Sequence, residues 1–372
     1  MTDDETATPG AGCVPPALEE IDTPALLLDR TKLTRNVFRM AEFVRGGPAK
    51  LRPHAKTHKC VEIAKLQLDA GAVGITCAKV GEAEALADGG IPDILIANEI
   101  IGPLKIARLV ELARRCKVTV AVDDSGNVRR LSEATVATGV TLGCYVEVNV
   151  GMDRCGVEPG APAAQLARLV DEADGLSFDG LQAYEGHLQN VVPFAEREAR
   201  AKLDMRKALF ASQQIEAGGL KVSQISGCGT GTHTITGRLP WMTELQCGSY
   251  ATMDAQYAAV GGANYENALT VLVTVISRPS PDKAIVDAGL KAVTPEFGNP
   301  TVLVRGAEWL DFSEEHGEVK LSAPAQGLRV GDKIALVPRH GCTTVNLYDR
   351  YQVIEDGALV AEWKVAARGR CQ

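Results

Sequence analysis

The stretch Leu51-Arg52-Pro53-His54-Ala55-Lys56-Thr57-His58-Lys59 decides how the rest of this chain is interpreted. A short apolar opening precedes it and an amphipathic run, Val61 to Leu68, follows, so Lys56 stands where a strand ends before a helix. Catalytic side chains collect at such strand ends in a barrel of alternating strands and helices. A neutral lysine there forms Schiff bases, and neighbouring positive charge and desolvation both favour the neutral amine. The alternative is a basic turn on the surface.

Composition limits the class of protein. The chain has 372 residues, which predicts one large or two ordinary domains, and 45% of them are hydrophobic and 23% charged, as in a globular protein with a substantial core. The formal charge of −8 gives no indication of a nucleic-acid partner. No apolar run approaches the ~20 residues of a membrane span, so we expect no membrane segment.

The N-terminus and the cysteines indicate the compartment. Residues 1–20 are acidic and rich in Pro, Gly and Ala, without a basic segment and an apolar core, so we expect a disordered tail and not a signal peptide. Ten cysteines are scattered without a Cys-x-x-Cys pair. They are expected to be reduced, and the cytoplasm is the expected location.

Short β-rich runs alternate with segments of mostly helical period up to about residue 266. This alternation predicts an α/β fold, a parallel (β/α)8 TIM-type barrel over residues 21–266, with an open doubly wound sheet as the alternative. The missing dinucleotide fingerprint after the first strand favours the barrel. An earlier strand, Ala25 to Leu28, could join either domain. The eight barrel runs are Lys50 to His54, Val73 to Ala78, Asp93 to Asn98, Val118 to Asp123, Leu142 to Val148, Phe178 to Tyr184, Gln224 to Gly227 and Leu245 to Tyr250.

From residue 267 to 372 the pattern changes to short β-type runs separated by Gly, Pro and Asp turns, which predicts a C-terminal all-β domain of ordinary size. Its expected strands are Leu269 to Ser277, Lys283 to Asp287, Thr301 to Val304, Lys333 to Val337, Tyr351 to Ile354 and Ala358 to Val365.

Two glycine-containing turns follow the seventh and eighth predicted barrel strands, where TIM-type barrels often hold a phosphate group. Glycine lets the backbone approach a ligand closely and turn its N–H groups toward an anion. A lone glycine-rich turn is weak evidence, whereas its place after this strand strengthens it. The expected phosphate-binding residues are Gly229, Thr230, Gly231, Gly248, Ser249 and Tyr250.

His340 and Cys342 lie two residues apart in Pro338-Arg339-His340-Gly341-Cys342-Thr343-Thr344 and would project to one side of an extended segment. Imidazole nitrogen and thiolate sulfur suit Zn²⁺. The alternative is a buried cysteine beside an unrelated histidine.

Taken together, the barrel, the β domain and the lysine that closes the first barrel strand resemble the fold-type III pyridoxal-phosphate enzymes, the alanine racemase-like group. Within it the sequence is similar to the branch of D-threonine aldolases, 3-hydroxy-D-aspartate aldolases and D-serine dehydratases. The likeness extends from about Asp22 to Ala367-Arg368-Gly369.

The resemblance implies roles for four residues around the cofactor. Lys56 matches the lysine that binds the cofactor aldehyde, and His54 would pack beside the cofactor ring. Arg154, in Gly151-Met152-Asp153-Arg154-Cys155-Gly156-Val157, matches the arginine that reaches the phenolic oxygen; an ion pair with a carboxylate at the barrel rim is the alternative. Tyr184 matches a tyrosine that lines the pocket, and simple packing is its alternative.

The general base is less defined. The aldolases of this branch place a histidine a few residues after the tyrosine, where this chain has Gln189-Asn190 and carries His187 nearer the strand. We take His187 and His316 as the candidate catalytic histidines. His316 and Asp287 could line the substrate entrance or serve in a turn and a strand end.

The branch carries a divalent metal, Zn, Mn or Mg, on the loop of His340 and Cys342. Its aldolases typically use His-x-Asp and its dehydratases His-x-Cys, whereas the following Thr-Val-Asn-Leu-Tyr-Asp is similar to the aldolases. The resemblance therefore implies a lyase that cleaves β-hydroxy-D-amino acids, of the D-threonine aldolase type, to glycine and an aldehyde. The alternative is a dehydratase of D-serine or 3-hydroxy-D-amino acids that releases a 2-oxo acid and ammonia.

Two other classes fit less well. A racemase would need a second base and no metal, and a non-catalytic cofactor carrier would lack the β domain. The resemblance also implies a small-molecule substrate, a homodimer, and an active site between one barrel and its partner's β domain.

Overall fold

A computed structural model describes residue 15 and residues 18–261 and 264–372, and the chain divides into two compact units. The barrel unit comprises Thr34–Ala251, Tyr257–Tyr265 and Val365–Gln372. The β unit comprises the described part of Met1–Leu33, Thr252–Gln256 and Glu266–Lys364. Most of the tail expected over residues 1–20 lies outside the described residues, although Leu18 is buried in the β unit with Ile21, Ala25, Leu27 and Leu272.

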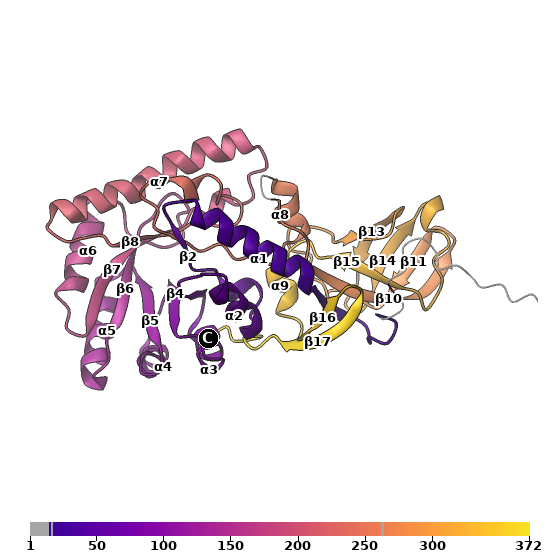
Figure 1. Cartoon of the computed structure of the whole chain (residues 1–372), viewed down its shortest axis with the longest axis horizontal. Coiled ribbons are helices and arrows are strands. Elements are labelled where there is room, and N and C mark those ends of the chain that lie inside the picture. Colours follow the sequence, from indigo (N-terminus) through magenta and orange to yellow (C-terminus); the bar gives the residue numbers. More distant parts are fainter. Residues whose placement is uncertain (1–14, 16–17, 262–263) are drawn as a thin grey trace, which may run out of the picture. The chain divides into compact units, whose positions relative to one another are not determined.

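An eight-stranded parallel sheet forms the barrel unit, with strand order β2-β9-β8-β7-β6-β5-β4-β3 (Figure 1). The end strands also meet, because Val73 N donates to Leu51 O and Thr76 N to Pro53 O, both at 2.9 Å. The sheet is therefore closed, and the predicted (β/α)8 barrel is confirmed. Its strands are β2 (Lys50–Leu51), β3 (Ile75–Cys77), β4 (Asp93–Glu99), β5 (Lys117–Val122), β6 (Leu142–Glu147), β7 (Leu176–Ala183), β8 (Gln224–Gly227) and β9 (Glu244–Leu245).

Helices follow most strands, and their apolar faces cover the sheet because parallel strands must be buried on both sides. The Asp29 carboxylate accepts the Lys32 amide at 2.9 Å and so caps the first helix. The helices are α1 (Arg30–Arg45), α2 (Val61–Asp69), α3 (Val80–Asp88), α4 (Pro103–Ala113), α5 (Ser125–Thr138), α6 (Ala161–Asp171), α7 (Phe194–Ala217) and α8 (Ala255–Val260), with short 3₁₀ turns η2 (Ala55–Thr57), η3 (Gly186–Leu188) and η4 (Thr236–Arg238). Among the described residues, no helix is both long and apolar enough to cross a membrane.

The β unit is a mostly antiparallel sheet with strand order β13-β14-β11-β10-β1-β16-β17, while β15 pairs with β10 and β12. The early strand β1 belongs here, since it pairs with β10 and β16. The bounds are β1 (Ala25–Asp29), β10 (Leu269–Ser280), β11 (Lys283–Val286), β12 (Thr301–Val302), β13 (Ala307–Phe312), β14 (Gly317–Leu321), β15 (Lys333–Val337), β16 (Arg350–Glu355) and β17 (Ala358–Lys364), with η5 (Ala323–Ala325) and α9 (Gly341–Val345).

Two strands of this sheet, β13 and β14, were not predicted. They carry charged residues on their exposed faces and bury only a few apolar side chains, among them Trp309, Val319 and Leu321. A strand with one exposed face that is largely charged gives a weak hydrophobic pattern.

Candidate active site

Lys56 lies in η2, directly after the strand segment that closes the barrel. Its backbone amide donates to His54 Nδ1 at 3.4 Å, which caps this short turn. The Lys56 Nζ lies 5.7 Å from the centroid of the Tyr184 ring, and the Arg154 Cζ lies 5.8 Å from the same centroid. The structure thus brings together three predicted residues that follow β2, β6 and β7, at the carboxyl ends of the barrel strands.

The basic neighbours of Lys56 do not form a group of free cations. Burial, and then the charges of Lys56 and His58, lower the pKa of His54 well below its usual value. Burial lowers the pKa of His58 to about 4, so both rings are neutral at pH 7. Lys59 forms a buried ion pair with Glu82. Neighbouring positive charge and desolvation were both expected to favour a neutral Lys56 amine. The neutral rings of His54 and His58 and the paired Lys59 contribute little of that positive charge.

The turn after β8 was expected to direct the amides of Gly229 and Gly231 at a phosphate. Both amides instead donate to protein atoms: Gly231 N to Gln189 Oε1 at 2.9 Å, and Gly229 N to Thr232 Oγ1 at 3.3 Å. A β-carbon at Gly229 would lie 2.3 Å from Gln189 Oε1, and one at Gly231 would lie 2.3 Å from the Gln189 carbonyl. The glycines are therefore needed for close packing against Gln189.

The turn after β9 packs against both other loops. A β-carbon at Gly248 would lie 2.6 Å from His54 O and 2.7 Å from Thr57 Oγ1. The Tyr250 amide donates to Thr230 Oγ1 at 3.0 Å, while the buried Tyr250 phenol accepts from Gln67 Nε2 at 2.9 Å. Gly248 thus lies against the loop that carries Lys56, and Thr230 lies against the turn after β9. The Thr230 hydroxyl accepts from Tyr250 and keeps its own proton for donation, which fits a phosphate oxygen.

Glu99 and Glu147, at the ends of β4 and β6, were not identified from the sequence. One ligand-type atom from each, and the Cys155 sulfur, all lie within 4.8 Å of one another. Glu147 lines a small cavity with Arg154, Cys155 and Tyr184. Burial, and then the charge of Glu99, raise the pKa of Glu147 to about 8, so Glu147 is mostly protonated at neutral pH. Their strand-end positions were the available signal.

His187 lies in η3, and its Nε2 is 2.9 Å from Asp204 Oδ2 of α7. Its Nδ1 is buried and has no hydrogen-bond partner among the described residues. Gln189, one of the two residues where a histidine was expected, is only 2% exposed and lies under the glycine turn. The role of His187 as a base stays a prediction.

His340 and Cys342 lie at the start of α9 in the β unit. The His340 Nδ1 is 2.9 Å from Asp254 Oδ2, and that oxygen also accepts the Gly341 amide at 3.0 Å. Burial opposes protonation of His340, but hydrogen bonds to Asp254 and to Cys342 outweigh it and raise the His340 pKa to about 10. A buried carboxylate on Nδ1 directs Nε2 toward a metal, as is usual for metal-binding histidines. These residues fit a divalent metal.

Asp254 is the residue of this centre that sequence reasoning missed. It lies 86 positions before His340 and is 1% exposed, and no local pattern distinguishes it from other loop aspartates. The two remaining candidates of the β unit lie elsewhere in its sheet. His316 is exposed in the turn between β13 and β14, and Asp287 accepts the Thr274 amide at 2.8 Å. Asp287 thus has a structural bond, and the site role of His316 stays a prediction.

A parallel barrel with a lysine after its first strand, and a separate, mostly antiparallel β unit, is the architecture of the alanine racemase-like enzymes. Residues 28–256 match the family model of the alanine racemase N-terminal domain, and residues 268–354 match a putative serine dehydratase domain. The chain belongs to the alanine racemase N-terminal domain family, which is pyridoxal-phosphate-dependent, and the predicted family is confirmed.

Two relatives show where in this family the chain stands. It is 41% identical to a D-threonine aldolase of Arthrobacter sp, over 97% of each chain. It is 40% identical to a 3-hydroxy-D-aspartate aldolase of Paracoccus denitrificans (strain Pd 1222), over 94% of this chain and 93% of the relative.

Solved structures agree with this placement. The crystal structure of a D-threonine aldolase from Filomicrobium marinum has a TM-score of 0.94 at 40% identity and covers 98% of this chain and 100% of that one. A D-threo-3-hydroxyaspartate dehydratase from Delftia sp. HT23 has a TM-score of 0.86 at 27% identity, covering 94% and 98%. A histidine-to-alanine variant of that dehydratase has been solved, as has a cysteine-to-alanine variant in the metal-free form, and the two positions are two residues apart.

Proposed function

We propose that this protein is a pyridoxal-phosphate- and metal-dependent lyase that cleaves β-hydroxy-D-amino acids to glycine and an aldehyde. The observation that carries the proposal is the approach of Lys56 and Arg154 to the same Tyr184 ring, beside the turns of Thr230 and Gly248. The D-threonine and 3-hydroxy-D-aspartate aldolases at 41% and 40% identity support the reaction class.

The residues of the barrel unit would bind and orient the cofactor. Lys56 would hold its aldehyde carbon, and Arg154 would place a fixed positive charge at the phenolic oxygen. Tyr184 would pack against the ring, and Thr230, Gly248 and Ser249 would hold the phosphate. When bound, pyridoxal phosphate supplies an electron sink for the electrons released at Cα.

The residues of the β unit would hold the metal. We propose that His340 binds it through Nε2 and Cys342 through its thiolate, with Asp254 fixing the imidazole. The histidine and cysteine varied in the D-threo-3-hydroxyaspartate dehydratase have the same spacing, which supports the assignment. The sulfur ligand favours Zn²⁺ over Mn²⁺ or Mg²⁺. A metal at this place would supply a Lewis acid for the substrate β-hydroxyl.

A dehydratase remains the second candidate, because the His-x-Cys pair is the spacing of that more distant relative. Incubation with D-threonine separates the two functions. The proposed aldolase gives glycine and acetaldehyde, whereas a dehydratase gives 2-oxobutanoate and ammonia. Formation of the 2-oxo acid as the main product would reject the aldolase assignment. A carrier protein would bind the cofactor and form neither set of products.

The metal assignment has its own test. Asp254→Asn should weaken metal affinity by about 10- to 100-fold, because such supporting carboxylates typically contribute that much. Competition with a fluorescent chelator measures the affinity without activity. Asp287→Asn is the matched control, since Asp287 also accepts a backbone amide in the β unit but bonds outside the metal loop. Equal affinity for Asp254→Asn and the control would contradict the assignment.

A homodimer and a cytoplasmic location also belong to the proposal. Light scattering coupled to size-exclusion chromatography tests the first, and cell fractionation tests the second.

A further inference from the structure

Gln189, on the loop after β7, is bonded to the glycine turn that follows β8. Its side chain bonds two atoms of the glycine turn at once: Oε1 accepts from Gly231 N at 2.9 Å, and Nε2 donates to Thr232 Oγ1 at 2.9 Å. Gln189 is 2% exposed and Thr232 is fully buried. Water therefore cannot replace either bond.

The close packing of the same turn depends on glycine at positions 229 and 231, which have no side chain. A β-carbon at Gly229 would lie 2.3 Å from Gln189 Oε1 and 2.5 Å from Gln189 Cδ. Gly231 has the same relation to the Gln189 carbonyl oxygen, at 2.3 Å. The turn thus packs directly against Gln189, with Gly229 on its side-chain amide and Gly231 on its backbone carbonyl.

A second buried residue fixes the far side of the turn. The Glu185 Oε1 accepts from Thr232 Oγ1 at 2.6 Å and from Thr236 Oγ1 at 2.8 Å. Glu185 is fully buried, and it precedes Gln189 on the same loop after β7. Glu185 and Gln189 therefore both bond the Thr232 hydroxyl, Glu185 as the acceptor and Gln189 as the donor.

The other face of the turn meets the loops of the candidate site. Thr230, between the two glycines, accepts the Tyr250 amide at 3.0 Å through its hydroxyl and the His233 ring at 2.7 Å through its carbonyl. A shift of the turn away from Gln189 would move the Thr230 hydroxyl. This hydroxyl accepts the amide of Tyr250, which directly follows Gly248 and Ser249 in the chain.

We propose that Gln189 is a positioning residue for the cofactor phosphate: it sets the shape of the 229–232 turn and thereby the affinity for the phosphate group. The inference rests on the proposed function.

The experiment compares two ligands that differ only in the phosphate. Equilibrium binding of pyridoxal phosphate and of pyridoxal to the apoprotein is measured for the wild type and for Gln189→Met, which keeps the volume but leaves the Gly231 amide without its acceptor. We expect binding of pyridoxal phosphate to weaken by roughly tenfold, about 1.4 kcal/mol. Binding of pyridoxal should change by less than about twofold, since the turn does not reach the ring.

Gln182→Met is the matched control. Gln182 is equally buried, at 2% exposed, but its side chain accepts from Gln246 and does not touch the turn. We expect it to leave the ratio of the two affinities unchanged even where it lowers the melting temperature. Gln189→Glu keeps the acceptor for Gly231 and should lie between Gln189→Met and the wild type, which preserves the test if the methionine variant fails to fold.

The outcomes separate the inference from the proposed function. Equal weakening of both ligands in Gln189→Met, or no weakening of either, overturns the positioning role. A wild-type protein that binds neither ligand overturns the proposed function itself, and the inference with it.

Discussion

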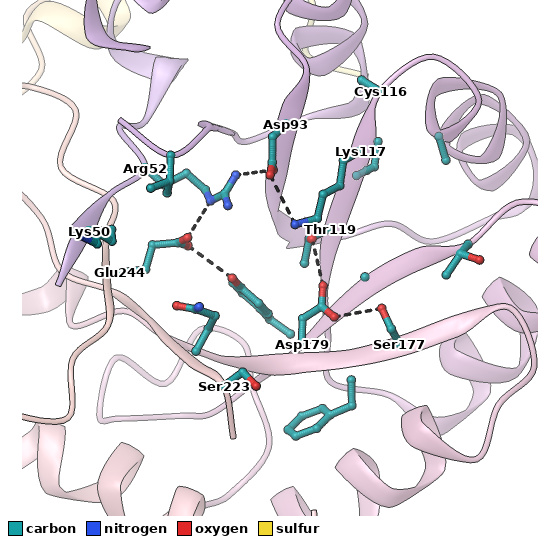
Figure 2. Close-up of a pocket in the computed structure, with 18 residues that line it drawn as sticks. Lys50, Arg52, Asp93, Cys116, Lys117, Thr119, Ser177, Asp179, Ser223 and Glu244 are labelled. Carbon is teal, nitrogen blue, oxygen red and sulfur yellow. Dashed lines mark hydrogen bonds and ion pairs between the residues drawn. The ribbon is translucent and has the colours of Figure 1, made fainter. Parts of the chain in front are cut away.

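The two ends of the barrel arrange their charged groups in different ways. At the end where the strands begin, a cavity of about 580 Å³ is lined by a network of paired charges around Arg52 (Figure 2). Arg52 bonds Glu244 at 2.8 Å and Asp93 at 2.5 Å, and Lys117 lies 3.4 Å from Asp93. At the carboxyl end, Lys56 and Arg154 both approach the ring of Tyr184. The first arrangement stabilises the fold, and the second is suited to binding a ligand.

The largest effect should come from the carboxyl end. Lys56→Ala should lower activity by at least about 1,000-fold, because it removes the nucleophilic amine. The melting temperature should fall less than after a substitution of Arg52, because Lys56 is half-buried whereas Arg52 is buried. Activity assays and thermal unfolding measure the two effects. A variant with unchanged activity would show that Lys56 is not the reactive residue.

Arg52→Met tests the opposite end. It leaves the carboxylates of Glu244 and Asp93 without their cation, and breaking a buried pair of this kind costs about 3–5 kcal/mol. Denaturant unfolding measures the loss. Activity of the folded fraction should remain within about twofold, because Arg52 lines the cavity away from Lys56. Adding Glu244→Gln should recover part of the lost stability, and a larger loss in the double variant would contradict the pairing.

Glu147→Gln tests an exception to the difference between the two ends of the barrel. Glu147 and Glu99 are two neighbouring carboxyl groups at the carboxyl end. Burial and Glu99 raise the Glu147 pKa in the folded protein to about 8, above its unfolded value. The wild type therefore keeps more protons folded than unfolded, and its stability falls as pH rises from about 5 to 8, by at most about 1.4 kcal/mol per pH unit. This slope should be reduced in Glu147→Gln. Melting temperatures across that pH range check the sign of this slope. An unchanged slope in Glu147→Gln would mean that Glu147 does not hold the proton.

The smallest effect is expected for Lys117→Met. Lys117 belongs to the paired end, but its side chain is 65% exposed and its contact with Asp93 is long. Exposed pairs contribute about 0–1 kcal/mol, so unfolding and activity should both stay close to the wild type. A loss comparable to that of Arg52→Met would show that the whole network, and not burial of Arg52, determines stability at this end.

The sequence predicted the barrel because its buried strands are short apolar runs between helices, and β8 has the predicted bounds of Gln224 to Gly227. Strand β1 could not be assigned to a unit, since its pairing with β10 and β16 joins segments more than 200 residues apart. The pairing of Arg52 was hidden for the same reason. In the sequence it belongs to one basic motif with Lys56, while its partners Asp93 and Glu244 come from two distant strands.

The candidate site was predictable where a motif is local, as for Lys56 and for His340 with Cys342. Residues that act by supporting others, Asp254 and Gln189, have ordinary surroundings in the sequence and gain their contacts only on folding. The expected amides of Gly229 and Gly231 illustrate the same limit, because a glycine-rich turn does not tell which way its N–H groups point.

Arg52 and Lys56 are four residues apart, yet Arg52 forms ion pairs at the end of the barrel where the strands begin and Lys56 lies at the carboxyl end. The connecting backbone is held at both sides, by Leu245 and Cys247 on one neighbour and by Val73 and Thr76 on the other. The spacing within this segment is thus as constrained as its side chains. A substitution can alter Arg52 or Lys56 separately. Adding or deleting a single amino acid between them would displace both together.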